Sequence, residues 1–357
     1  MAARIAAFVI VSGTATVVAS CQPQNVPQPT SSPTSNSSQS PTTQPVALKP
    51  VLAGFLDRNT VPPASFIPVM GGWVVNVNWA DIQPAQGAPI ASPNAIDAAI
   101  ATLHQIDPSG RMGLKVRLFA GIHAPEWAKS LGGSPIPIED PTSGTPGTIG
   151  RFWTDDFGAA YRDLQAKLAA MYDSAPEIRE ITISRCTTVY AEPFIRDASS
   201  PLSVASLMSA GFTVDADQRC HREEVVAHQV WIHTRSDLSF NPYQNLGGGP
   251  VRDEAFTETM MSFCRSTLGA RCVLENNSLR VPPLYSDMYA AMQTAGPPIA
   301  FQTAVLAKVG GIVPTIQYAI SLGAASVELP AGYQNLPVAT LNAGYSALVA
   351  DAGRSAA

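Results

Sequence analysis

The stretch Ile181-Thr-Ile-Ser184, continued after Arg185-Cys186 by Thr187-Thr-Val-Tyr-Ala-Glu192-Pro193, decides the fold. Its β-branched residues predict a buried strand over Ile181–Val189. The strand leads to Glu192, whose backbone Pro193 restricts to an extended conformation. The carboxylate is therefore held stiffly where the strand stops, either as a functional group or, on the dipeptide alone, as a cap for the following loop.

Similar strand patterns recur along the chain after a Pro/Ser-rich N-terminal region. The other seven are Val51–Phe55, Trp73–Val77, Leu114–Phe119, Leu238–Phe240, Cys272–Leu274, Ile299–Phe301 and Ser326–Leu329. Helical patterns separate most of them: one starting at Ser92-Pro93, one marked by Phe157, Tyr161, Leu164, Leu168 and Met171, then Arg222–Thr234, Glu254–Leu268, Leu284–Thr294, Val313–Leu322 and Leu336–Val349. After the first strand the connection is short and Pro-rich, and a helix there is doubtful.

This alternation predicts the α/β class, with one (β/α)8 TIM barrel over residues 47–357. A doubly wound open sheet is the rival. It would place a Gly-rich phosphate-binding turn after an early strand, whereas Gly71-Gly72 precedes its strand.

The N-terminus predicts export. Arg4 precedes an apolar run, Ile5–Val18, and Val18-Ala-Ser-Cys21 follows. This pattern is typical of a signal peptide, here residues 1–20. The Ala-Ser-Cys step resembles a bacterial lipobox, which implies lipidation of Cys21 and an extracytoplasmic protein anchored to the cell membrane. The alternative is a plain secretory peptide. Residues 21–46 are rich in Pro, Ser, Thr and Gln and predict a tether without a core.

Four further cysteines suggest two disulfides in an exported chain. Three pairings are possible, and we favour Cys264–Cys272 with Cys186–Cys220. The sequence lacks Cys-x-x-Cys and His-x-x-x-His spacings, so we expect no metal site, and no cofactor motif is present. The net charge of −5, with 14% charged residues and no basic run, excludes a nucleic-acid footprint.

Polar and aromatic residues follow the predicted strands at one rim of the barrel. Asn78-Trp-Ala-Asp-Ile-Gln-Pro-Ala-Gln-Gly87 resembles the Trp-x-x-(Leu/Ile)-(Glu/Gln)-Pro-x-x-Gly motif of clan A glycoside hydrolases. His123-Ala-Pro-Glu-Trp127 is similar to the Pro-x-Trp segment after their third strand, and Glu192-Pro193 to the Glu-Pro step after their fourth. The resemblance implies that Glu192 is a general acid/base and that the ligand is a carbohydrate.

The chain departs from this family at two places. Ala191 stands where the family has an Asn, and Gln302 follows strand seven, where the family carries a nucleophilic Glu. Hydrolysis of a glycosidic bond usually needs two carboxylates. Glu328 is our preferred second carboxylate, ahead of Glu275, with Asp57 further back. The alternative role of Glu328 is an ion pair with Arg117 or Arg185.

The sequence therefore supports an exported, lipid-anchored glycoside hydrolase that acts on an envelope or environmental glycan. Its catalytic residues would be Glu192 and Glu328. The expected substrate-binding residues are Asp57, Asn78, Trp79, His123, Trp127, Tyr190, Asn241, Glu275, Asn277 and Gln302. A glycan-binding barrel that has lost catalysis is the alternative, and a surface lipoprotein that contacts proteins is a third hypothesis.

Overall fold

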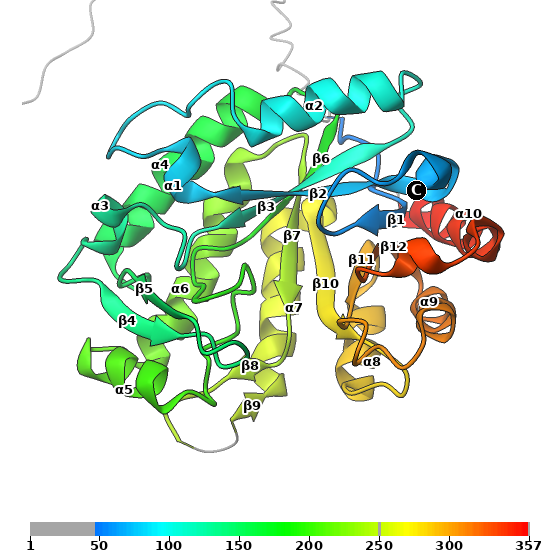
Figure 1. Cartoon of the computed structure of the whole chain (residues 1–357). Helices are drawn as coiled ribbons and strands as arrows, with labels where there is room; N and C mark the ends of the chain where they lie inside the picture. Colours follow the sequence, from blue (N-terminus) through cyan, green and yellow to red (C-terminus); the bar gives the residue numbers. More distant parts are fainter. Residues whose placement is uncertain (1–46, 249–250, 356–357) are drawn as a thin grey trace, which may run out of the picture. The chain divides into compact units, whose positions relative to one another are not determined.

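The computed structural model describes residues 47–248 and 251–355. The predicted signal peptide, the lipidation site at Cys21 and the tether lie outside the described residues. Eight parallel strands close into a barrel, with the last strand paired to the first (Figure 1). In barrel order these strands are β1 (Gly54–Asp57), β12 (Ala324–Leu329), β11 (Ile299–Thr303), β10 (Cys272–Leu279), β7 (Arg235–Phe240), β6 (Ile178–Thr182), β3 (Gly113–Phe119) and β2 (Met70–Asn78).

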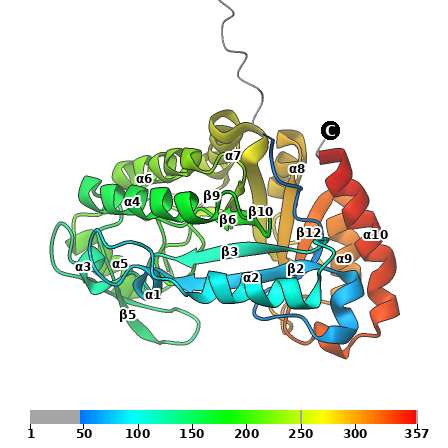
Figure 2. The same ribbon diagram turned by 90° about the horizontal axis from the view of Figure 1, so that it is seen from above.

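Helices surround this barrel, as the view from above shows (Figure 2). They are α2 (Ala95–Ile106), α4 (Asp155–Tyr172), α6 (Val214–Ala227), α7 (Glu254–Leu268), α8 (Ser286–Ala295), α9 (Ile312–Ser321) and α10 (Val338–Ser355). The connection after β1 holds only the 3-10 helix η1 (Ala64–Val69). The predicted (β/α)8 barrel is thus confirmed, and the rival open sheet is wrong. No helix within the described ranges is both long and apolar enough to cross a membrane.

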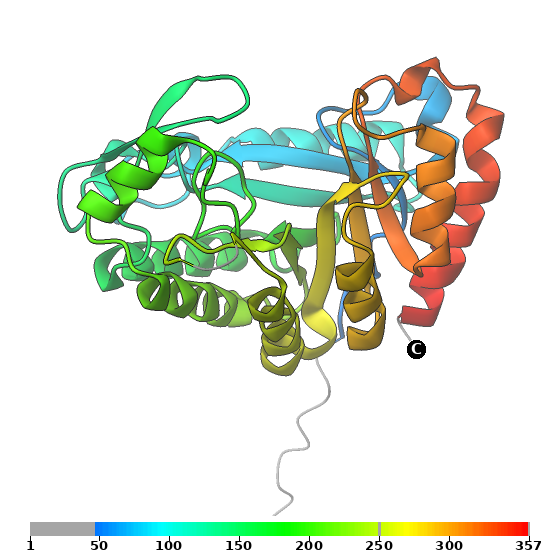
Figure 3. The ribbon, with the colours of Figure 1, turned by 90° about the horizontal axis from the view of Figure 1, so that it is seen from below.

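Shorter elements decorate the loops. They are α1 (Trp79–Ile82), α3 (Glu126–Lys129), α5 (Pro201–Ser209), the 3-10 turns η2 (His228–Val230), η3 (Gly269–Arg271) and η4 (Tyr333–Asn335), and two hairpins, β4 (Ile136–Glu139) with β5 (Pro146–Ile149) and β8 (Tyr243–Gln244) with β9 (Arg252–Asp253). Figure 3, the view from below, shows α8, α9 and α10 side by side around the last strands, in orange to red. All eight predicted strands occur, with bounds that differ by a few residues.

The fourth barrel strand is the exception to this agreement. The sequence predicts Ile181–Val189, whereas β6 ends at Thr182. Beyond Ser184 the backbone turns toward α6, because Cys186 is bonded to Cys220 and the Cys186 N–H donates to Glu224. Glu192 therefore lies in a long loop after the strand and not directly at its end.

Two helix boundaries also differ, for reasons of capping. The sequence predicts a start at Ser92-Pro93, but α2 starts at Ala95 because the Asn94 side chain accepts from the N–H groups of Ile96 and Asp97. The pattern over Arg222–Thr234 corresponds to α6, which starts eight residues earlier, after the Thr213 cap, and ends at Ala227. Past that end, the Asp173 carboxylate accepts from three consecutive N–H groups, of Ile232, His233 and Thr234, and holds them outside a helix.

Both predicted disulfides are present. Cys186–Cys220 joins the loop after β6 to α6, and Cys264–Cys272 joins α7 to the start of β10.

The chain enters the barrel at the face where the strands begin. The Lys49 ammonium donates to the carbonyls of Tyr172 and Ile178 and to the Thr234 hydroxyl, while the Arg235 side chain donates to the Lys49 carbonyl. Ile178 and Arg235 are the first residues of β6 and β7. We call this face the base and the opposite face, where the strands end, the mouth.

Candidate active site

The interior of the barrel is charged, although branched apolar side chains usually fill such a space. Lys115 on β3 contacts three carboxylates: Asp237 on β7 at 2.6 Å, Glu328 on β12 at 3.0 Å, and Glu275 on β10. Arg117, two residues further along β3 toward the mouth, donates to both Glu328 oxygens at 2.6 Å. All five side chains are buried.

These contacts divide the acids into two protonation classes. Burial raises the pKa of Glu275 well above its usual range, and the charges of Asp237 and Glu328 add to the effect. Burial opposes ionisation of Glu328 too, but Arg117 and Lys115 outweigh it and lower the pKa of Glu328 to about 2. Glu328 is therefore ionised near neutral pH, whereas Glu275 retains its proton to higher pH than a free Glu.

Glu192 lies at the mouth, half-buried, between the ends of two strands. The Asn241 amide, one residue beyond β7, donates to Glu192 Oε2 at 2.6 Å, and the Asn277 side chain of β10 is also hydrogen-bonded to Glu192. Burial raises the pKa of Glu192 and the charge of Glu328 adds to this, while Asn241, Asn277 and Arg117 act in the opposite direction. The result is a fixed carboxyl group that retains its proton to higher pH than a free Glu.

Asn277 carries a free acceptor beside this group. Its side chain is 7% exposed, and its buried Oδ1 has no hydrogen-bond partner in the part of the chain that the structure describes. Gln302 of β11 is half-buried next to it and its amide lies 3.5 Å from the Asn277 carbonyl. Asn241 and Asn277 thus contact Glu192, and Gln302 lies beside Asn277. Their roles in substrate binding stay predictions.

Three other predicted site residues are buried and make contacts that stabilise the fold. The Trp79 side chain is 0% exposed and packs edge-on against Trp127 and Phe157. Its indole N–H donates to the Gln83 side chain. Trp79 is therefore a core residue, and its assignment to substrate binding is wrong. Asp57 is 2% exposed and accepts from the N–H groups that follow it and from the Tyr333 hydroxyl. Glu275 is sealed in the barrel by Lys115.

The remaining predicted residues lie on loops at the mouth. Asn78 donates to Asp81 at 2.9 Å, and the exposed His123 packs edge-on against Phe119. Trp127 is half-buried and donates to the Gln83 carbonyl. The Tyr190 hydroxyl is 3.1 Å from both Asp140 oxygens, and its side chain is 39% exposed. Their roles in ligand binding stay predictions.

Sequence reasoning named the ion pair of Glu328 with Arg117 as the alternative role of Glu328, and this pair is present. It missed Lys115 and Asp237 at the centre of the barrel. Lys115 and Arg117 alternate with Leu114, Val116 and Leu118 along β3, and this period of two places both cations on the inner face. The alternation was visible in the sequence. It becomes informative only once the opposing acids are known, because they come from strands far apart in the chain.

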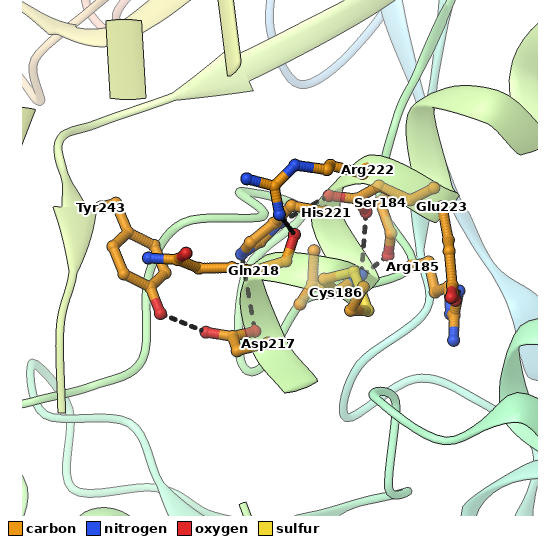
Figure 4. Close-up of polar contacts among 12 residues, drawn as sticks. Ser184, Arg185, Cys186, Asp217, Gln218, His221, Arg222, Glu223 and Tyr243 are labelled. Atoms are coloured by element: carbon orange, nitrogen blue, oxygen red, sulfur yellow. Dashed lines mark hydrogen bonds and ion pairs between the residues drawn. A yellow bond between two sulfur atoms is a disulfide. The ribbon is translucent and has the colours of Figure 1, made fainter. Parts of the chain in front are cut away.

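A second buried polar network lies beside the loop after β6 (Figure 4). Arg196 donates to both Asp217 oxygens, at 2.8 and 2.7 Å, and to His221 Nε2 at 2.8 Å. His221 Nδ1 then donates to Glu224 at 2.8 Å, and the Tyr243 hydroxyl donates to Asp217. Cys186, His221 and Glu224 have ligand atoms within 4.8 Å of one another, but the sulfur is in a disulfide and both imidazole nitrogens have partners. The contacts explain how the loop is held.

No family model matches the chain, and a search of curated proteins found no match. Solved structures do resemble it. TcOYE with pHBA is 15% identical, with a TM-score of 0.51, over 88% of this chain and 94% of that one. The catalytic domain of beta-amylase from Paenibacillus polymyxa is 11% identical (TM-score 0.47, 82% of this chain and 93% of that one), and endo-glycoceramidase II from Rhodococcus sp. is 14% identical (TM-score 0.46, 84% and 81%).

These neighbours include glycoside hydrolases, but at this identity the likeness shows the barrel fold alone. Because one fold hosts many activities, the function has to be argued from the side chains at the mouth.

Proposed function

We propose that this protein is a glycoside hydrolase in which Glu192 protonates the leaving oxygen of an O-glycosidic bond. The observation that carries the proposal is the opposite displacement of two acids that interact electrostatically: the pKa of Glu192 is raised, and that of Glu328 is lowered to about 2. A pair of carboxyls driven apart in this way supplies one proton donor and one anion at the same pH.

The surrounding side chains suit these roles. Asn241 and Asn277 fix the orientation of the Glu192 carboxyl, and the unpartnered Asn277 Oδ1 can accept a hydrogen bond from a sugar hydroxyl. This pair would replace the Asn that the related enzymes carry at the position of Ala191. Glu328, held ionised by Arg117 and Lys115, would stabilise the positive charge that develops on the sugar ring in the transition state.

One observation favours the alternative of a glycan-binding barrel without hydrolysis. The Glu328 side chain is 1% exposed and both of its oxygens are bonded to Arg117. A carboxylate in this position has no free oxygen with which to attack a sugar carbon. In the alternative, Glu192, Asn241 and Asn277 bind sugar hydroxyls, and Gln302 takes the place of a nucleophile.

The cellular location of the protein is also part of the proposal. The pattern Val18-Ala-Ser-Cys21 and the Pro/Ser/Thr-rich residues after it support an exported lipoprotein tethered to the membrane through Cys21. Two disulfides suit an oxidising compartment. An extracytoplasmic barrel on a tether would meet envelope or environmental glycans.

The test is a screen of the purified protein against a polysaccharide panel, followed by substitution of the two acids. Glu192→Gln should lower the turnover of unactivated substrates by ~10²–10⁴-fold and affect substrates with good leaving groups much less. Glu328→Gln should reduce both. The exposed Glu258→Gln on α7 is the matched control. Glycan binding without turnover of any panel member would establish the binding-barrel alternative, and wild-type turnover by Glu192→Gln would refute the assignment of the acid.

A further inference from the structure

Glu192 lies in a connection without regular secondary structure. The loop over residues 183–200, between β6 and α5, carries the acid near its middle. The Glu192 carbonyl accepts from the Ile195 N–H at 3.4 Å, which is a long hydrogen bond. The 2.6 Å contact between the Asn241 amide and Glu192 Oε2 therefore depends on what holds this loop from outside.

Gln244 of β8 is bonded to the part of this loop that follows Glu192. Its backbone N–H donates to the carbonyl of Phe194, two residues beyond Glu192, at 3.0 Å. Its side-chain Oε1 accepts from the N–H groups of Arg196 and Ala198, at 2.8 and 3.2 Å. One residue thus makes three hydrogen bonds to the segment directly after the acid.

The segment that begins with Asn241 is itself held by the barrel. Asn241 is one residue beyond β7, and its Oδ1 accepts from the Asn276 amide of β10 at 3.4 Å. Two residues further along, the Tyr243 N–H donates to the Thr257 hydroxyl of α7 at 2.9 Å. Gln244, the next residue, therefore connects the loop of the acid to the same support that carries the hydrogen-bond donor of the acid.

The buried network of Figure 4 joins the same two segments a second time. Arg196 donates to both Asp217 oxygens at 2.8 and 2.7 Å, and the Tyr243 hydroxyl donates to Asp217 at 2.9 Å. All three side chains are buried, so removing one of them would leave a buried polar or charged group without its partner. Gln244 is half-buried and uncharged, and it can be replaced without that penalty.

We propose that Gln244 is a positioning residue for Glu192, which holds the acid in its place between Asn241 and Asn277. This inference rests on the proposed function of Glu192 as a proton donor and adds a residue on which that function depends. Gln244 acts through the backbone of the loop and needs no contact with the substrate. A displacement of about 1 Å at a reacting group can lower a rate by about 10²-fold.

The first measurement follows the Glu192 carboxyl and needs no substrate. In full-length protein labelled with ¹³C in its Glu side chains, the Glu192 signal is assigned by its absence from Glu192→Gln and is titrated with pH. Gln244→Met has nearly the same shape but no oxygen acceptor. It should bring the pKa of Glu192 down toward the ordinary value, because a displaced carboxyl gains water and burial is the main cause of the raised pKa.

Two other variants interpret this titration. Gln165→Met on α4 removes the buried acceptor of the Trp231 N–H and should leave the Glu192 pKa unchanged. Asn241→Ala removes a hydrogen bond that favours the ionised form and should raise the pKa further. An unchanged titration in Gln244→Met overturns the inference. A rise like that of Asn241→Ala also overturns it, because Gln244 would then orient the asparagine and not the acid.

The second measurement is turnover of a glycan that the wild type cleaves. Gln244→Met should lower kcat by about 10²-fold and leave KM nearly unchanged, whereas Gln244→Glu keeps an acceptor oxygen and should retain most of the turnover. A loss confined to KM would make Gln244 a binding residue and contradict the positioning role. If the wild type cleaves no glycan, the proposed function fails, and the titration of Glu192 still decides the role of Gln244.

Discussion

At the scale of single residues, Lys115 links three of the buried acids of the barrel. Its ammonium contacts Asp237, Glu275 and Glu328, and these charges outweigh burial and raise the pKa of Lys115 well above its usual range. Glu180, on the neighbouring strand, has no such direct partner and one of its buried oxygens takes no hydrogen bond in the described structure. Burial raises the pKa of Glu180 to about 8.

This acid makes the stability of the protein depend on pH. Unfolded Glu180 releases its proton near the ordinary pKa of 4.5, whereas the folded protein retains it to about 8. The stability that this group contributes is complete below pH 4.5 and is lost as the pH rises to about 8, by about 1.4 kcal/mol per unit at most. Glu180→Gln should therefore be more stable than wild type at pH 8, with a difference that shrinks toward pH 5. Urea unfolding at several pH values measures this, and an unchanged difference across that range would contradict it.

Glu328 and Glu192 should respond differently to the same substitution. Glu328→Gln leaves Arg117 and Lys115 with one buried anion fewer, and we expect a loss of about 3–5 kcal/mol in the free energy of unfolding. Because the pKa of Glu328 is lowered to about 2, its contribution is present above pH 4.5 and fades as the pH falls toward 2. Glu192→Gln keeps an acceptor for Asn241 and should change stability by less than about 1 kcal/mol. Denaturant titration distinguishes the two, and equal losses would mean that Glu192 is also structural.

At the scale of elements, side chains and disulfides decide where helices and strands stop. Periodicity predicts that α2 and α6 exist, but the caps Asn94 and Thr213 set where they begin, and the disulfide to α6 ends β6 early. The disulfide partner of Cys186 lies 34 residues away in the sequence, so a local strand pattern does not reveal it.

The two disulfides should contribute unequally to stability. Cys186–Cys220 closes a loop of 34 residues and Cys264–Cys272 one of 8. Restriction of the unfolded chain predicts about 3.8 kcal/mol for the longer loop and about 2.5 kcal/mol for the shorter one. Paired Cys→Ser variants, unfolded in urea, should show the larger loss for Cys186→Ser with Cys220→Ser. A larger loss for the short loop would show that native contacts, and not the unfolded chain, control the effect.

At the scale of the whole molecule, the sequence predicts the barrel and part of its mouth. Alternating strand and helix patterns are strong, local signals, and parallel strands all end at one face. Asn241 and Asn277, which follow or end different strands, both contact Glu192, and Gln302 lies beside Asn277. Trp79 was misassigned, because a turn residue next to a strand can direct its ring inward, here against Phe157 of α4. Whether a side chain faces ligand or core depends on three-dimensional packing.

Membrane attachment is the prediction that concerns the chain as a whole. If Cys21 carries a lipid, Cys21→Ala should release the protein from the membrane or block its maturation. Fractionation of cells, with wild type as the reference, measures the change. A variant that stays with the membrane to the same extent would leave the lipoprotein proposal without support.

The hydrogen bonds that hold Lys49 at the base of the barrel have a practical consequence. Because Lys49 lies at the base through contacts with Tyr172, Ile178 and Thr234, a tag joined directly to Ala47 would start from the face opposite Glu192. A protein immobilised on a sensor chip through such a tag should therefore present its mouth to the flowing solution. Glycan binding can be measured on such a surface without blocking the group that it is meant to probe.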